Sequence, residues 1–214
     1  TCTSLGYFTE RIAKSNLIGI GFTNASPIVA APGGKSRIIG TNPIAFSVPD
    51  GKGNTAIHFD QSTTAVALGK ITMAKAAGEK IPFGWALDKN GEPTTDPEAA
   101  LEGSLVSSGG YKGWGFGLMA EVLAAGLAGG LASQFVQPLK AKDGDPHHLG
   151  QYYIIIDPQN APALENLLND LETAVSKDEG TRLPGQGKVA EEFVVVPDDL
   201  LVLLEKLTGL EWND

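Results

Sequence analysis

The order in which helical and strand-like patterns follow one another most constrains the fold of this 214-residue chain. Apolar, β-branched runs predict strands at 17–23, 44–48, 55–59 and 151–156. Helical spacing of apolar residues predicts helices at 5–12, 62–77, 97–101, 114–133, 161–175 and 198–207. The two patterns do not alternate regularly, as they would in a doubly wound parallel sheet. The sequence therefore predicts a mixed α/β (α+β) fold rather than a Rossmann fold.

Small residues dominate the predicted helix at 114–133, which is rich in glycine and alanine. Because such residues let another backbone approach closely, we expect this helix to lie at the centre of the fold. The stretch 115–131 within it is the nearest candidate for a membrane span, but it is rich in glycine, Glu121 interrupts it, and it is shorter than the ~20 apolar residues that a span needs. The sequence therefore predicts no membrane partner.

Charge and cysteine content exclude several classes of function. The chain has 25 acidic and 16 basic side chains, a net charge of -9, and no basic cluster. Binding to phosphate backbones needs local positive charge, so we expect no nucleic-acid partner. One cysteine, Cys2, excludes an internal disulfide and a multi-cysteine metal site, and favours a reducing, cytoplasmic location.

The three histidines give no firm site. His147 and His148 form either a metal-binding pair or a solvated loop, and base rates favour the loop, so we predict no metal. His58 lies in a predicted strand close to Asp60, as either a hydrogen-bonded interior histidine or a cofactor contact.

Glycine-rich polar loops at 33–35, 40–43 and 109–113 are more informative. Such loops expose backbone N–H groups, and Lys35 and Lys112 add positive charge that could meet a phosphate or carboxylate. Each loop taken alone is better explained as a tight turn in a compact fold. Three of them together favour an anionic cofactor or substrate, although no G-x-G-x-x-G or P-loop motif is present.

The segment 60–64 lies between a predicted strand and a predicted helix. Free N–H groups at a helix start favour an anion, and Asp60 could bond a ribose hydroxyl. Asp60 or Ser62 could equally be an ordinary helix N-cap, and the residues alone leave both readings open.

These loops, in this order, resemble the malate/L-lactate dehydrogenase-type oxidoreductases, a family distinct from the Rossmann lactate and malate dehydrogenases. The resemblance covers most of the chain from residue 5 to 185. The matching segments are GFTNASPIVAAPGGK (21–35), GTNPIAFSVP (40–49), FDQSTTAVALGKI (59–71), IPFGWALDKNGEPTTDPEAALEGSL (81–105), GGYKGWGFGLMAEVLAAGLAGG (109–130) and RLPG (182–185).

The resemblance implies a malate/L-sulfolactate/L-lactate dehydrogenase-like fold and a homodimer. It also implies an NADPH- or NADH-dependent reductase that acts on a small-molecule substrate, a 2-oxo acid or a cyclic 2-imino acid. Residues 60–62 and 150–153 most resemble the Δ1-piperideine-2-carboxylate/Δ1-pyrroline-2-carboxylate reductases. Ureidoglycolate, sulfolactate, lactate and malate dehydrogenases are the sister activities. Asp60 alone favours NADH, whereas the resemblance to imine reductases favours NADPH.

The resemblance also assigns binding residues. It places Thr41 at the substrate and implies cofactor contacts in four segments. These are Asn24, Ala25 and Ser26 at the nicotinamide end, Phe59, Asp60 and Gln61 at the adenosine ribose, Lys112, and Pro184, Gly185 and Gln186.

Catalytic residues are not assigned. The family calls for an N-terminal Ser-His-Gly segment, a nearby arginine and a second histidine at or just before Thr1, and this sequence contains none of them. We therefore expect residues 1–214 to be the cofactor-binding and C-terminal portion, about two-thirds, of a single oxidoreductase unit. A non-catalytic, cofactor-binding remnant is the alternative.

Overall fold

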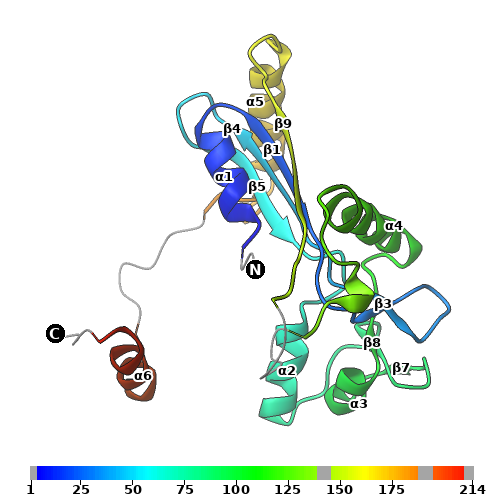
Figure 1. Ribbon diagram of the computed structural model, residues 1–214. Helices are drawn as coiled ribbons and strands as arrows, with labels where there is room; N and C mark the ends of the chain where they lie inside the picture. Colours follow the sequence, from blue (N-terminus) through cyan, green and yellow to red (C-terminus); the bar gives the residue numbers. More distant parts are fainter. Residues whose placement is uncertain (1–3, 139–145, 188–194, 210–214) are drawn as a thin grey trace.

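The computed structural model describes residues 4–138, 146–187 and 195–209, which are built around two β-sheets (Figure 1). The first sheet is antiparallel, in the order β5-β4-β1-β9. The second has the order β3-β2-β8-β6-β7 and pairs β2 with β8 in parallel. Helices lie beside the sheets, so the predicted mixed α/β fold is confirmed. The strands are β1 (Ile18–Thr23), β2 (Val29–Ala30), β3 (Arg37–Ile39), β4 (Ile44–Pro49), β5 (Thr55–Gln61), β6 (Ala86–Leu87), β7 (Pro93–Thr94), β8 (Ser104–Leu105) and β9 (Gln151–Ile156).

Small residues on one face of the first sheet make room for helix α1 (Gly6–Lys14). A Cβ atom on Gly19 would lie 3.1 Å from the side chain of Ile12, and one on Gly21 would lie 3.1 Å from that of Thr9. Both glycines belong to β1, a central strand of the sheet. The glycines in this apolar strand therefore let α1 approach closely.

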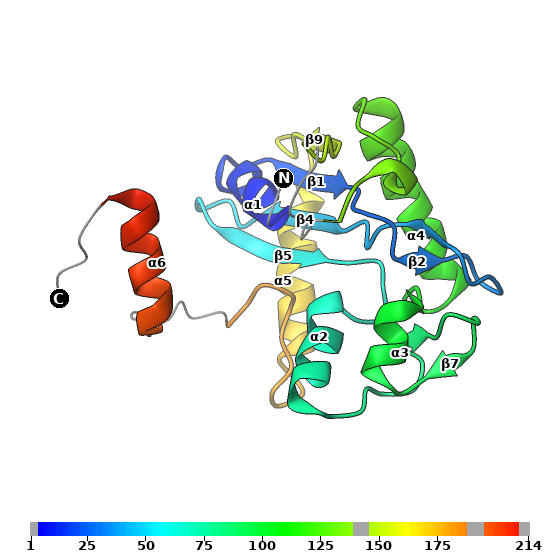
Figure 2. The same ribbon diagram turned by 60° about the horizontal axis from the view of Figure 1, so that its bottom comes forward.

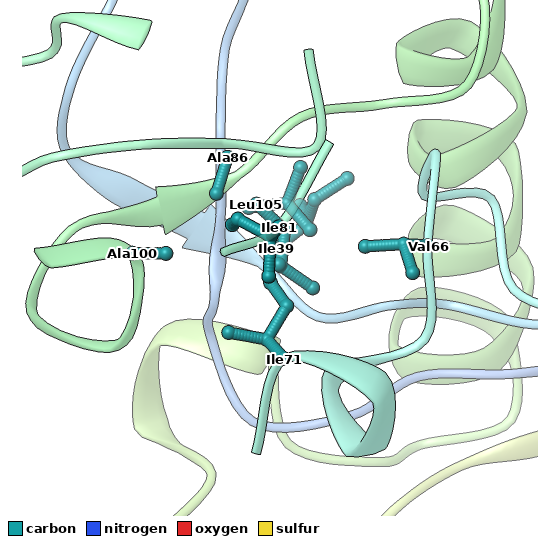
Figure 3. Packing of buried hydrophobic residues seen from close by; sticks show 8 residues of the cluster. Ile39, Val66, Ile71, Ile81, Ala86, Ala100 and Leu105 are labelled. Carbon is teal, nitrogen blue, oxygen red and sulfur yellow. The ribbon is translucent and has the colours of Figure 1, made fainter. Parts of the chain in front are cut away.

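The second sheet shares a hydrophobic core with α2 (Leu68–Ala77) and α3 (Pro97–Glu102). Asp96 caps α3 by accepting the backbone N–H of Glu98 at 2.9 Å, and Pro97 occupies the first turn as predicted. Figure 3 shows side chains of α2, the strands and the connecting segments meeting in this core. Its buried members are Val29, Ile39, Val66, Ile71, Ile81, Ala86, Ala100 and Leu105.

The predicted helix at 62–77 begins later than expected, at Leu68. Thr63 and Ala65 donate their backbone N–H groups to carbonyl oxygens of other segments, so residues 62–67 bond outward instead of forming a helical turn. Ser62 is therefore not the N-cap, and its hydroxyl pairs with a neighbouring threonine hydroxyl at 2.8 Å.

Helix α4 (Tyr111–Glu121) continues as a π-helical segment (Val122–Leu127) and ends before the predicted residue 133. Its buried residues are all small, and these are Gly113, Gly117, Ala120 and Ala124. Its larger apolar residues are exposed, including Val122 at 60%. The expectation of a central helix is therefore wrong, because only the small-residue side packs against the fold while the other faces outward (Figure 1).

The C-terminal helices are α5 (Ala163–Val175) and α6 (Asp198–Thr208), close to the predicted ranges. Neither helix has a buried residue, and α6 stands apart from the other elements in both views (Figures 1 and 2). Within the described residues, no helix combines the length and apolar character needed to cross a bilayer.

We expect Gly150→Ala to lower the free energy of unfolding by about 1–3 kcal/mol or more, because its Cβ would overlap the backbone carbonyl of Ala124. Gly115→Ala is the matched control, since a Cβ there meets open space on the outer side of α4. It should leave stability unchanged or raise it by up to ~1 kcal/mol. Urea unfolding of the two variants measures this, and equal stabilities would contradict the close packing.

Candidate functional site

A groove of about 810 Å³ lies where the end of β5 meets the N-terminal ends of α2 and α4. Aromatic rings contribute much of its wall, from Phe59, Trp85 and Phe116. Lys70 and Lys112 bring two cations to it. An apolar groove with a few convergent polar groups is typical of small-molecule sites.

Backbone hydrogen bonds hold three sequence segments together at this groove. The carbonyl oxygen of Thr41 accepts the N–H of Thr63 at 2.9 Å and also the hydroxyl of Thr63 at 3.1 Å. The carbonyl oxygen of Thr63 in turn accepts the N–H of Ser108 at 3.0 Å. The glycine-rich loops at 40–43 and 109–113 therefore flank the segment 60–64, whereas the loop at 33–35 does not line the groove.

Two helix N-termini converge on the groove, each without a side-chain cap in the described structure. Lys70 lies in the first turn of α2, and Lys112 lies in the first turn of α4. Free N–H groups and the helix dipole favour an anion at such ends, and each lysine adds a full charge. This arrangement fits a phosphate-bearing ligand.

A second groove, of about 590 Å³, has the opposite charge balance. It lies at the other end of the first sheet, around the β4–β5 turn and the start of α5. Three carboxylates, Asp50, Asp157 and Glu165, line it with one lysine, Lys52. In the turn, the backbone N–H groups of Asn54 and Lys52 donate to Asp50 and lower the pKa of its carboxyl. An anionic ligand is therefore favoured at the groove between α2 and α4.

Asp60 lies on the wall of the candidate groove, but its carboxylate is engaged by helix α1. Its Oδ2 atom accepts the backbone N–H of Gly6 at 2.8 Å and the hydroxyl of Ser4 at 3.4 Å. Asp60 is therefore not the N-cap of the helix that follows it, as one of the two sequence-based readings expected, because its carboxylate accepts the first N–H of α1 instead.

His58 is hydrogen-bonded within the protein. Its Nδ1 atom lies 2.8 Å from the hydroxyl of Ser47, which donates to Thr9, whose hydroxyl donates to the carbonyl of Gly6. Because each hydroxyl has one proton to donate, His58 must donate from Nδ1. This agrees with the interior-histidine reading, and His58 does not line the groove.

Glu121 of α4 stabilises the loop beside the groove through hydrogen bonds. The sequence analysis considered this residue only because it interrupts an apolar stretch. It accepts the side-chain amide of Asn42 at 2.8 Å, and the backbone N–H and hydroxyl of Ser133 at 2.6 and 2.5 Å. Asn42 and Ser133 are fully buried, and Asn42 has a φ of 34°. Glu121 thereby fixes the loop that carries Thr41. A charged residue in an apolar, glycine-rich helix was the available sequence signal.

The segment 24–26 lies behind this loop. The backbone N–H of Ala25 donates to Asn42 Oδ1 at 3.2 Å, and a Cβ on Gly40 would lie 2.4 Å from the carbonyl oxygen of Ala25. The Asn24 side chain is buried and bonds the backbone of Gly150 at 3.0 Å and of Leu131 at 2.7 Å. The Asn24 amide therefore joins its own segment to those of Leu131 and Gly150, while Ser26 is half-buried.

The segment 184–186 docks on the outer edge of β5, away from the groove lining. The carbonyl oxygen of Pro184 accepts the N–H of His58 at 2.9 Å. Gly185 has a φ of 95°, and a Cβ there would lie 2.9 Å from the His58 backbone. Gln186 donates to Glu172 of α5 at 3.2 Å.

The expected binding residues thus divide into two groups. The first lies at the groove: its wall contains Phe59, Asp60, Gln61 and Lys112, and Thr41 is bonded to that wall. The second group, residues 24–26 and 184–186, lies outside the groove lining. Among the described residues, the side chains of Ser26, Thr41, Gln61 and Lys112 have no hydrogen-bonding partner and remain available to a ligand. Two uncapped helix ends, two unpaired lysines and aromatic walls fit a dinucleotide cofactor.

For metal binding, the described part of the chain contains no cluster of three or more histidine, cysteine, aspartate or glutamate residues suited to an ion.

We expect Glu121→Gln to lower the free energy of unfolding by about 1–3 kcal/mol, because three donors face the carboxylate and an amide offers one acceptor oxygen. Glu98→Gln is the control, since Glu98 pairs only with Lys75 at the surface, and it should change stability by less than ~0.5 kcal/mol. Denaturant titration compares them, and an unchanged Glu121→Gln midpoint would show that the network does not brace the fold.

The family described as malate/L-lactate dehydrogenase matches residues 1–192. The chain is 43% identical over 183 residues to a (2R)-3-sulfolactate dehydrogenase (NADP(+)) of Chromohalobacter salexigens, covering 82% of this chain and 53% of that protein. It is 36% identical over 210 residues to a Δ1-pyrroline-2-carboxylate/Δ1-piperideine-2-carboxylate reductase of Pseudomonas aeruginosa, covering 92% and 63% respectively.

Among solved structures, the Δ1-piperideine-2-carboxylate reductase from Pseudomonas syringae superposes with a TM-score of 0.82 at 32% identity, covering 96% of this chain and 64% of that one. The implied malate/sulfolactate dehydrogenase-like fold is therefore confirmed. The chain spans about half the length of the first curated relatives it matches, 53% and 51%. On the family match and these identities, the chain belongs to the malate/L-lactate dehydrogenase family.

Proposed function

We propose that this protein is an NADPH- or NADH-dependent oxidoreductase and that the groove between α2 and α4 holds its cofactor. The observation that carries the proposal is the convergence of two helix N-termini that, within the described residues, have no side-chain cap and each carry an unpaired lysine in the first turn. Such ends are suited to phosphate groups. The family's relatives include enzymes named for NADP(+) and NAD(+), which supports the choice of a nicotinamide dinucleotide.

The proposed substrate is a cyclic 2-imino acid, Δ1-piperideine-2-carboxylate or Δ1-pyrroline-2-carboxylate, reduced to the L-amino acid. The bound cofactor would supply a hydride to C2, and a proton would go to the ring nitrogen, so that the C=N bond becomes C–N. The unpaired hydroxyl of Thr41, beside the groove wall, is the substrate contact we propose. The TM-score of 0.82 to a piperideine-2-carboxylate reductase supports this substrate class.

Reduction of a 2-oxo acid to a 2-hydroxy acid is the second candidate. It is supported by the 43% identity to a sulfolactate dehydrogenase, which exceeds the 36% identity to the imine reductase of P. aeruginosa. The chemistry differs only in the atom that receives the proton, oxygen in place of nitrogen.

The test is cofactor binding followed by turnover. Titration with NADPH and NADH, followed by nicotinamide fluorescence, should show saturable binding. Consumption of the reduced cofactor with Δ1-pyrroline-2-carboxylate, but not with pyruvate, would support imine reduction, and the reverse would select the 2-oxo acid. Binding without turnover on either substrate, even after the N-terminal segment that the family carries is added, would favour the non-catalytic alternative. Absence of binding would refute the proposed cofactor site.

We expect Lys112→Gln to weaken the binding of both dinucleotides about tenfold, because one charge-assisted contact to the pyrophosphate is lost. Lys35→Gln is the matched control, since Lys35 lies in another glycine-rich loop and does not line the groove. It should leave both dissociation constants within about twofold. Equal effects of the two substitutions would place the phosphates elsewhere.

We further propose a cytoplasmic homodimer in which a second copy covers the exposed apolar side of α4. Val122, 60% exposed on that side, is the test position. Light scattering during size-exclusion chromatography should give twice the chain mass, and Val122→Lys should shift it toward the monomer because a charge enters an apolar interface. Met73→Lys, at a 72% exposed position on α2, should leave the mass unchanged. A monomeric starting protein would contradict the dimer.

A further inference from the structure

We infer that Asn42 is a positioning residue of the proposed substrate site, whose buried amide fixes the turn that presents the Thr41 hydroxyl to the substrate. The inference rests on the proposed function, which makes Thr41 the substrate contact, and it adds the residue on which the orientation of Thr41 depends. Three observations support it: the backbone conformation of Asn42, the hydrogen bonds of its amide and the burial of the residues on either side of Thr41.

Asn42 has an unusual backbone conformation. Its φ of 34° lies in the left-handed region, which residues other than glycine adopt rarely. Pro43 follows it, and the residue before a proline is normally restricted to extended conformations. Asn16 and His148 also have a positive φ, but both are exposed, whereas Asn42 is fully buried. A strained conformation persists only where the surrounding structure holds it, and such residues cluster at functional sites.

The Asn42 side chain supplies the contacts that hold this conformation. Its Nδ2 group donates to the carbonyl oxygen of Gly117 at 3.0 Å and to Glu121 Oε2 at 2.8 Å, both in α4. Its Oδ1 atom accepts the backbone N–H of Ala25 at 3.2 Å. Both donor hydrogens of the amide and its acceptor oxygen are therefore used. The amide thus joins its own loop to α4 and to the segment that contains Ala25.

Thr41 lies between two buried residues and differs from both. Gly40 and Asn42 are buried, and a Cβ on Gly40 would lie 2.4 Å from the carbonyl oxygen of Ala25. Thr41 is half-buried, and among the described residues its hydroxyl has no hydrogen-bonding partner. Its carbonyl oxygen accepts the N–H of Thr63 in the groove wall. The turn is therefore held on both sides of Thr41, and the Thr41 hydroxyl is left to bind a ligand.

A hydroxyl binds a small substrate well only when the backbone that carries it is held in place, because an error of about 1 Å can cost a hundredfold in rate. Asn42 holds that backbone through contacts that are all within the protein. Gln61 and Lys112, at the proposed dinucleotide site, belong to β5 and α4, which have backbone hydrogen bonds of their own. Loss of the Asn42 amide should therefore weaken the substrate more than the dinucleotide.

The experiment is a double-mutant cycle between Asn42→Gly and Thr41→Val. Calorimetry measures the binding of pyrrole-2-carboxylate, a planar aromatic analogue of the cyclic imine, to protein saturated with NADPH or NADH, whichever binds more tightly. Each single substitution should weaken the analogue about tenfold, and the double variant should be within about twofold of either one, because Asn42 acts through Thr41. The dissociation constant of the dinucleotide should change less than about twofold.

Asn16→Gly is the matched control. It replaces another asparagine of positive φ, 61°, at an exposed position that lines the second groove. It should change the binding of neither the analogue nor the dinucleotide. Melting temperatures identify an unfolded variant. If Asn42→Gly is unfolded, Asn42→Asp replaces it in the cycle, since aspartate keeps the acceptor toward Ala25 and loses both donors.

Four results would overturn the inference in distinguishable ways. Additive losses in the double variant would show that Asn42 does not act through Thr41. Unchanged analogue binding in the Asn42 variant would remove its role, and equal losses of analogue and dinucleotide would assign the amide to the frame of the whole groove. Binding of a dinucleotide without the analogue would remove the proposed substrate class and this inference, and leave the cofactor proposal intact. Failure of the unaltered protein to bind either dinucleotide would remove the proposed function as well.

Discussion

The hydrogen-bonded path from Thr41 through Thr63 to Ser108 is the constraint on which the site depends. It joins the loop before β4, in the first sheet, to residues 107–110 after β8, in the second. Buried backbone groups need partners, so the segment 62–67 bonds outward and helix α2 begins only at Leu68. The segment 62–67 therefore lines the groove together with Lys70 in the first turn of α2.

Local charge in the groove opposes the charge of the whole chain. The protein carries a net charge of -9, yet the described residues that line the groove include two lysines without an ion pair and one carboxylate. The carboxylate, Asp60, is held by α1, and the lysines lie at helix starts, so the field that an anion meets there is positive. Net charge alone argues against polyanionic partners such as nucleic acid, but it does not predict the sign of a single groove.

Sequence patterns predicted the strands of the first sheet and most helices, because periodicity and turn residues are local signals. They also identified the glycine-rich loops that flank the groove. Gly6, which donates a hydrogen bond to Asp60, lies 54 residues from it in the sequence. Asn42, which donates to Glu121, lies 79 residues from it. No local pattern contains such contacts. The expected cap at Ser62 failed for the same reason, since distant pairing outweighed a local preference.

A match to family motifs assigns residues to a site without separating those that hold the frame from those that face the ligand. The hydrogen bonds make that distinction. The amides of Asn24 and Gln186 are hydrogen-bonded to neighbouring segments, and the carboxylate of Asp60 is hydrogen-bonded to α1. Within the described residues, the side chains of Thr41 and Lys112 form no hydrogen bond. Because a binding site needs a rigid outer frame to orient its free groups, both kinds of residue belong in one motif, and we expect the free side chains to supply direct contacts to the proposed cofactor or substrate.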